Sequence, residues 1–230
     1  TIANTFHMFV NREPRFYAWI AFDGGDMGSR IYGGQPLKLE MRNSELHGYN
    51  PSLFNRDNCV TGYLSQKFIE PTFAWTASAE EKQNKPRPLI RMAELYLNLA
   101  ECCAALDEVP QALAQLNIIR KRAGIRELTT SDVTDDMPIM KWVQNERFVE
   151  LWGEGHRYYD IRRWMIAPEY MSAGVRRGLN AMSKLDPSFE EFNTPVVISQ
   201  DFKWTNRMYF LPVFENEVYK NPQLIQAPGY

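Results

Sequence analysis

The stretch from Ile139 to Trp164 most constrains the fold, because it combines large apolar rings with a dense set of charges. Pro138 suits the first turn of a helix, where its missing N–H costs nothing. Gly153 and Gly155 predict a break in that helix, followed by a second and shorter helix over 156–164. The sequence therefore predicts a helical hairpin in this stretch.

Two glutamates on the first of these helices indicate a covered ion network. Glu146 and Glu150 are four residues apart on one helix face, where like charges repel unless a cation lies beside them. The apolar neighbours predict that this face is covered, and a buried unpaired charge is costly. Arginines of the second helix are candidate partners, because a guanidinium group can bind a carboxylate through two hydrogen bonds. We expect a structural ion network that consists of Glu146, Arg147, Glu150, Arg157, Asp160 and Arg163.

Composition excludes several classes of protein. The 230 residues include 26 Lys and Arg against 28 Asp and Glu, and this balance gives no basic surface for nucleic acid. The hydrophobic share of 44% is typical of a globular chain. Of three Cys, the adjacent Cys102 and Cys103 do not suit a disulfide framework. No apolar run approaches the length of a membrane span.

The first 85 residues are rich in turns and short apolar runs. Phe16 to Phe22 is predicted to form a strand, and Tyr63 to Ile69 is a second candidate. Between them, Gly28 to Asn58 is rich in Gly, Asn, Ser and Pro, which predicts a long loop. Long ordered loops in compact proteins are often functional, so this region is the candidate ligand platform.

Residues 86–170 show helical periodicity. Pro88 is predicted to open a helix with an apolar stripe formed by Leu89, Met92, Tyr96, Leu99, Cys103 and Leu106. Small residues on this helix leave room for a neighbour: Ala93, Ala100 and Ala104. Leu95 and Cys102 add apolar surface on another side, so we expect this helix to be covered from more than one direction.

Pro110 is predicted to start the next helix, and its apolar stripe consists of Ala112, Leu116, Ile119 and Ala123. The two helices have the size of a tetratricopeptide unit, and 139–164 supplies a second pair. Residues 171–230 return to loop and strand. The sequence thus predicts a mainly α chain of helical hairpins flanked by loop- and strand-rich segments.

Catalytic motifs are not found in the sequence. Its histidines have no metal-ligand spacing, and no nucleophile elbow, phosphate loop or dinucleotide fingerprint occurs. Asp23 and Asp26 favour a turn over a calcium site, because the EF-hand spacing is missing. Glu146 and Glu150 have the residue types of a glycosidase pair, but one turn apart among arginines they are typical of salt bridges. We expect no enzymatic activity, no cofactor and a structural role for His156.

Aromatic residues make up 13% of the chain and offer a better functional lead. Flat rings stack on the apolar faces of sugars, while amide and guanidinium groups bind the hydroxyls. The candidate ligand-binding residues are Trp19, Tyr32, Tyr49 and Trp75, with Asn50, Asn55 and Arg56 as polar neighbours. For each ring alone, ordinary packing is the alternative, and Trp19 especially so because it lies in a predicted strand.

Several motifs resemble those of one family. Asn145-Glu146-Arg147, Glu150-Leu151 and the run from Glu154 to Trp164 resemble the "ER–EL–EGHRYFDLRRW" signature of SusD/RagB proteins. Tyr159 and Ile161 are conservative departures from it.

The same resemblance extends along the chain in order. Glu13-Pro14-Arg15-Phe16 resembles the family's "DPRF", and residues 91–101 and 116–124 resemble its helical motifs. The segment 209–230 resembles the closing "YL-PIP–E–NP–QNPGY", with Ala227 in place of the usual Asn. The motifs run from about Glu13 to the last residue, without those of the family's N-terminal half.

The resemblance implies a SusD-like fold of the α/α superhelix type. Residues 1–230 would form one C-terminal region, with 1–85 as the ligand platform, tetratricopeptide-like hairpins over 86–170 and an irregular segment over 171–230. The signal, the lipidated Cys and the first helical repeats of such a protein are not in this sequence. We therefore expect either a processed chain or a piece of a longer one.

The resemblance also implies a function. SusD/RagB proteins are outer-membrane lipoproteins that capture nutrients at the cell surface of Bacteroidota for a SusC-type TonB-dependent transporter. The expected ligand is an oligosaccharide, and peptide capture as in RagB-like relatives is an alternative. A soluble helical-repeat adaptor for protein partners is a second alternative. A glycoside hydrolase is the weakest, because no acid and nucleophile pair is credible.

Overall fold

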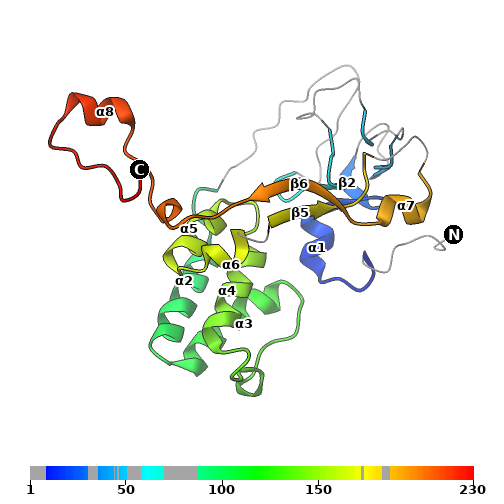
Figure 1. The fold of residues 1–230 in the computed structure, drawn as a ribbon. Coiled ribbons are helices and arrows are strands. Elements are labelled where there is room, and N and C mark those ends of the chain that lie inside the picture. The colour runs from blue at the N-terminus through cyan, green and yellow to red at the C-terminus, as the bar shows by residue number, and fades with distance from the viewer. Residues whose placement is uncertain are drawn as a thin grey trace. The chain divides into compact units, whose positions relative to one another are not determined.

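The computed structural model describes residues 9–30, 36–43, 45, 47–50, 58–69, 88–171, 174–182 and 187–230 (Figure 1). The chain divides into two compact units. The first unit comprises Thr1–Glu154 and Gly178–Val196, and the second comprises Gly155–Arg177 and Val197–Tyr230.

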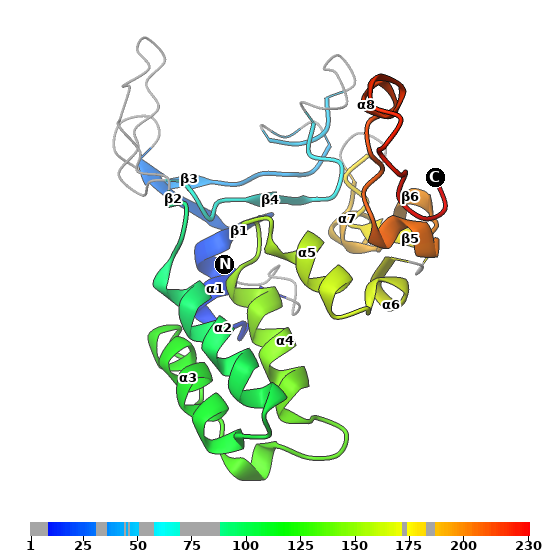
Figure 2. The ribbon, with the colours of Figure 1, turned by 90° about the vertical axis from the view of Figure 1, so that its left-hand side faces the viewer.

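Three helices build the larger core of the first unit. They are α2 (Met92–Ala105), α3 (Val109–Arg122) and α4 (Ile139–Glu150), which lie side by side (Figure 2). A short 3-10 helix, η4 (Thr130–Asp132), lies between α3 and α4 in the chain. The core residues of these elements include Leu97, Leu113, Leu116, Ile119 and Val143. None of the helices that the structure describes is long and apolar enough to cross a membrane.

The apolar stripe predicted for α3 is confirmed, because Ala112, Leu116, Ile119 and Ala123 are all buried. The stripe predicted for α2 is wrong for four of its six residues, whereas Cys103 is buried and Tyr96 is partly buried against the core. Leu89 and Leu106 are 95% and 70% exposed, and Met92 and Leu99 are exposed as well. The buried face of α2 instead consists of Ala93, Leu97, Ala100, Cys103 and Ala104. Small side chains on this face let α3 and α4 approach closely, and this packing decides which of two apolar faces is inside.

A second core in the first unit joins the segments around the short strands. Here α1 (Pro14–Trp19) leads directly into β1 (Ile20–Phe22), which pairs antiparallel with β4 (Tyr63–Ser65). The hairpin of β2 (Asp26–Arg30) and β3 (Pro36–Lys38) and the helix α7 (Phe189–Asn193) complete its elements. The core residues include Phe9, Leu39, Met41, Leu179 and Phe192.

The strand predicted over 16–22 is therefore wrong for its first four residues. Pro14 lies in the first helical turn, where its fixed φ favours the helix, and Ile20 leaves it in an extended conformation. Strand β4 also ends earlier than predicted. The predicted long loop over 28–58 includes part of the β2–β3 hairpin.

The second unit contains short elements. They are α5 (His156–Arg163), α6 (Ala167–Met171), β5 (Gly174–Gly178), β6 (Val196–Phe202), η5 (Asn206–Tyr209) and α8 (Glu215–Lys220). Strands β5 and β6 pair with one another (Figure 1). The predicted break between the two helices of 139–164 is confirmed, since Gly153 and Gly155 both have positive φ, which glycine adopts without strain.

Candidate binding site at the junction of α1 and α4

Glu150, at the end of α4, is the centre of a buried ion network. Its side chain is 0% exposed, and three guanidinium groups donate to its carboxylate. Arg15 Nη1 lies 3.0 Å from Oε2, Arg122 Nη2 lies 2.6 Å from Oε2, and Arg91 Nη1 lies 3.1 Å from Oε1. These residues come from α1, from the end of α3 and from the residue before α2. One carboxylate thus joins three other elements to α4.

Glu146 extends the same network by one helical turn. Its Oε1 accepts from Arg15 Nη1 at 2.6 Å and its Oε2 accepts from Arg120 Nη1 at 3.0 Å. Arg15 also binds both carboxylate oxygens of Glu13, at 2.8 and 3.0 Å. Burial opposes the charge on Arg15, but the hydrogen bonds that it donates to Glu13 and Glu146, and the negative charges of these two groups, outweigh burial and raise the pKa of Arg15 above its ordinary value.

The arginines on Glu146 and Glu150 differ from those that the sequence suggested. Arg163 contacts Asp160 at 2.9 Å within α5, and the guanidinium of Arg157 stacks on the ring of Tyr170. Arg147 donates to Asn98 Oδ1 on α2 at 2.6 Å. The partners of the glutamates are instead distant in sequence, and spacing on one helix does not reveal them. The signal that points to Arg15 is its place in the Glu13-Pro14-Arg15-Phe16 motif.

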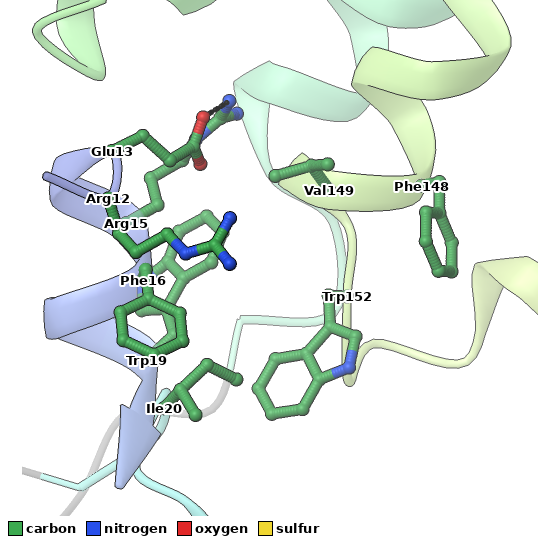
Figure 3. Close-up of a pocket in the computed structure, with 9 residues that line it drawn as sticks. All are labelled: Arg12, Glu13, Arg15, Phe16, Trp19, Ile20, Phe148, Val149 and Trp152. Carbon is green, nitrogen blue, oxygen red and sulfur yellow. Dashed lines mark hydrogen bonds and ion pairs between the residues drawn. The ribbon is translucent and has the colours of Figure 1, made fainter. Parts of the chain in front are cut away.

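Beside this network lies a hollow of about 390 Å³, here called the α1–α4 hollow. Its lining residues are Arg12, Glu13, Arg15, Phe16, Trp19, Ile20, Phe148, Val149 and Trp152 (Figure 3). Phe16 and Trp19 come from α1, whereas Phe148, Val149 and Trp152 come from α4 and the turn after it. Its volume falls within the range of about 300–1,000 Å³ that is common for small-molecule sites.

The α1–α4 hollow is mainly apolar with charged groups at one side. Two indole rings and the ring of Phe16 provide flat apolar surfaces, and the guanidinium group of Arg12 extends toward the same space (Figure 3). Glu13 is bound on both oxygens by Arg15, so its charge is already matched. Such a site can stack a flat ligand and hydrogen-bond its polar edge.

The residues proposed for ligand binding are not all in one place. Trp19 lines the hollow. Tyr49 and Asn50 are described but are not among its lining residues, and the backbone of Asn50 exchanges two hydrogen bonds with Asn58, of 2.8 and 3.0 Å. The remaining candidates lie outside the described residues, and they are Tyr32, Asn55, Arg56 and Trp75.

Sequence reasoning missed Trp152 as a site residue. It lies two residues beyond the end of α4 and directly before Gly153, so its ring does not belong to the apolar stripe of that helix. An aromatic residue between a helix end and a glycine is the signal that would have found it. Asp23 is a turn residue as expected, whereas Asp26 is the first residue of β2. The carboxylate of Asp23 accepts from Met41 N at 2.9 Å and from Arg42 Nε at 3.3 Å. Among the described residues, no group of three or more His, Cys, Asp or Glu could hold a metal ion.

Comparison with known proteins identifies the class. A model of the SusD family matches residues 3–230, so the chain belongs to the SusD family. The mainly α fold is confirmed by solved SusD-like structures. One is the SusD-like protein BF3747 of Bacteroides fragilis, with 29% identity and a TM-score of 0.77 over 97% of this chain and 40% of that one.

Two further relatives are informative. A solved structure of BT4246 is 55% identical, with a TM-score of 0.90 over 99% of this chain and 39% of that one. The SusD-like protein P25 of Formosa agariphila is 30% identical over 116 residues, which cover 47% of this chain and 22% of that protein. The chain therefore spans about two fifths of the length of the solved relatives.

Proposed function

We propose that this chain belongs to a cell-surface protein that captures oligosaccharides and passes them unchanged to a SusC-type TonB-dependent transporter. The observation that carries the proposal is the α1–α4 hollow, with Trp19 and Trp152 in its lining and Arg12 beside them. Membership of the SusD family supports a role in nutrient capture. Attachment to the outer membrane through a lipid anchor of the full-length protein is part of the same proposal.

The chemistry of the hollow favours a sugar. One face of a pyranose ring is formed by C–H groups, which pack on an indole, while its hydroxyls need donors and acceptors at the edge. The lining offers both kinds of group, because the indoles of Trp19 and Trp152 are flat and Arg12 donates hydrogen bonds. A peptide would use the same rings for its side chains, and the experiment below separates the two ligands.

The ion network supports binding without catalysis. A glycosidase needs one carboxylic acid that protonates the leaving group and a second carboxylate as nucleophile or base. All four oxygens of Glu146 and Glu150 accept hydrogen bonds from arginines, so neither group is available for proton transfer. The two glutamates hold the helices together instead.

Calorimetric titration with a panel of oligosaccharides and peptides tests the proposal. At least one oligosaccharide should bind, and Trp152→Ala and Trp19→Ala should each weaken that binding about tenfold, which is about 1.4 kcal/mol. Trp164→Ala is the matched control, because Trp164 lies in the second unit and is not a lining residue. Circular dichroism checks that each variant keeps its helices.

Three outcomes would overturn the proposal. They are binding of peptides only, equal binding by the wild type and both site variants, or shortened sugars in the reaction mixture. The transporter is tested separately by co-purification of this protein with a SusC-type transporter from the same organism. Loss of that partner would remove only the delivery step.

A further inference from the structure

Lys67 lies just after β4 and is largely buried, with a side chain that is 5% exposed. Its ammonium group donates to Glu150 O at 2.7 Å, to Trp152 O at 2.8 Å and to Glu154 Oε1 at 2.5 Å. An ammonium group has three donors, so all of them are used. A lysine in the strand-rich part of the first unit thus binds the end of α4 and the turn after it.

The location suits a cation for two reasons. The last carbonyl groups of a helix have no partner within it, and the helix dipole places partial negative charge there. Burying an ammonium group is costly unless it is paired, and Glu154 provides the opposite charge. Arg91 also binds this turn, with Nη2 at 3.2 Å from Glu150 O and at 2.6 Å from Glu154 Oε1.

The same ammonium group also contacts the opposite side of the α1–α4 hollow. Its Nζ lies over the indole of Trp19, 4.0 Å from the ring centre, which is within the distance of a cation–π interaction. The side chain of Trp19 and the backbone of Trp152 therefore share one partner. Both tryptophans line the hollow, although 133 residues separate them in the chain.

We propose that Lys67 is a positioning residue for ligand binding, which holds the Trp19 and Trp152 sides of the hollow at the separation that a ligand needs. This inference rests on the proposed function, because it takes the hollow as the binding site. Lys67 itself is not among the lining residues and acts through the two tryptophans. A rigid site binds more tightly, since less conformational freedom is lost when the ligand enters.

The first test needs no ligand. The protein is labelled with 5-fluorotryptophan, and the fluorine resonances of its six tryptophans are recorded by NMR, with Trp19 and Trp152 assigned through Trp19→Phe and Trp152→Phe. In Lys67→Met, these two resonances should broaden or split because the rings sample several positions. The resonances of Trp142, Trp164 and Trp204 should stay sharp, as should all six in Lys38→Met, whose lysine is 73% exposed.

The second test is affinity for the oligosaccharide found by titration. Lys67→Met should weaken binding about tenfold, whereas Lys38→Met should bind like the wild type. Lys67→Arg is the second variant, which keeps the positive charge and therefore the fold. A planar guanidinium group cannot direct three donors to the same two carbonyls and one carboxylate, so binding should be intermediate.

The outcomes separate this inference from the proposed function. Sharp, unshifted resonances in Lys67→Met together with unchanged affinity would overturn the role of Lys67. Broadened resonances with unchanged affinity would show that Lys67 holds the two rings but would overturn its role in ligand binding. The affinities of Trp19→Ala and Trp152→Ala then test separately whether the hollow is the sugar site. Equal loss of affinity in Lys67→Met and Lys38→Met would also contradict the inference, since only one of these lysines contacts the tryptophans.

Discussion

The two sides of the junction between α1 and α4 differ in how completely their side chains are bound by other parts of the protein. On one side, Glu146 and Glu150 are buried and every carboxylate oxygen accepts a hydrogen bond from an arginine. On the other side, the rings of Trp19 and Trp152 line a hollow of about 390 Å³. Both sides use residues of α1 and of α4 or the turn after it.

This difference assigns separate tasks to the two sides. A satisfied network has no capacity left for a ligand, but the loss of one member leaves buried charges without partners. A ring at the wall of a hollow contributes less to folding, because part of its surface is not packed against protein. Stability should therefore depend mainly on the network, and recognition mainly on the tryptophans of the hollow. Arg15 and Glu13 belong to both sides, because they line the hollow as well.

The largest expected effect is on the network side. Glu150→Ala leaves Arg15, Arg91 and Arg122 around an empty position, and we expect the free energy of unfolding to fall by about 3–5 kcal/mol. Urea titration followed by circular dichroism measures this loss. Affinity for the sugar, corrected for the folded fraction, should stay close to that of the wild type.

An exposed ion pair provides the control for Glu150→Ala. Glu217 contacts Lys220 at 2.9 Å, and the two side chains are 54% and 70% exposed. Glu217→Ala should lower the free energy of unfolding by less than about 1 kcal/mol. If Glu150→Ala costs no more than this control, the comparison between the two sides fails.

Trp152→Ala should show the reverse pattern. We expect affinity to fall about tenfold, which is about 1.4 kcal/mol, while the free energy of unfolding falls by less than in Glu150→Ala. The backbone carbonyl of residue 152 still accepts from Lys67 in this variant, so the end of α4 keeps its cation. If Trp152→Ala instead lowers the free energy of unfolding as much as Glu150→Ala and leaves the affinity per folded molecule unchanged, Trp152 contributes to stability and not to recognition.

Much of the network side could be anticipated from local sequence. Glu146 and Glu150 share a helix face, and apolar neighbours indicate that the face is covered, so a buried ion network is a sound expectation. Its arginine partners could not be identified in this way. Arg15 is 135 residues from Glu150, and only the tertiary fold brings them to 3.0 Å.

The packing of α2 shows a second limit. Helical periodicity allowed two apolar faces, one with Leu89, Met92 and Leu99 and one with small residues and Leu97. The larger side chains favoured the wrong face, since the close approach of α3 and α4 requires alanines at the contact.

The hollow shows a third limit. The sequence indicates Trp19 as a candidate binding residue but predicts a strand there, whereas Trp19 ends helix α1. Trp152, the second tryptophan of the hollow, is not predicted. The hollow is formed by two segments that are distant in the chain, and no single window of sequence contains both.

Acid should weaken the ion pairs that Glu154 makes with Arg91 and Lys67 next to the network. Burial opposes the charge on Glu154, but hydrogen bonds from Arg91 and Lys67 outweigh it and hold the pKa of this carboxyl below its ordinary value of 4.5. A carboxyl whose pKa is lower in the folded state stabilises the protein fully above the unfolded value, and this contribution is lost as the pH falls through the folded value. Unfolding curves between pH 6 and pH 3 should show a steeper loss of stability in the wild type than in Glu154→Gln. Equal slopes would mean that Glu154 does not contribute.

The smallest effect concerns Arg122, the member of the network that faces solvent. Its guanidinium lies 2.6 Å from Glu150 Oε2, but its side chain is 51% exposed, whereas that of Arg15 is 6% exposed. Water and salt screen the exposed charge, and Glu150 keeps Arg15 and Arg91 when Arg122 is removed. Arg122→Ala should therefore lower the free energy of unfolding by less than about 1 kcal/mol, and Arg15→Ala by about 3 kcal/mol or more, in the same urea titrations.

Salt provides a second measurement. The loss of stability in Arg122→Ala should shrink in 1 M NaCl, while that in Arg15→Ala should change little, because buried pairs are screened less. Equal costs for the two variants at both salt concentrations would show that burial does not set the strength of this network.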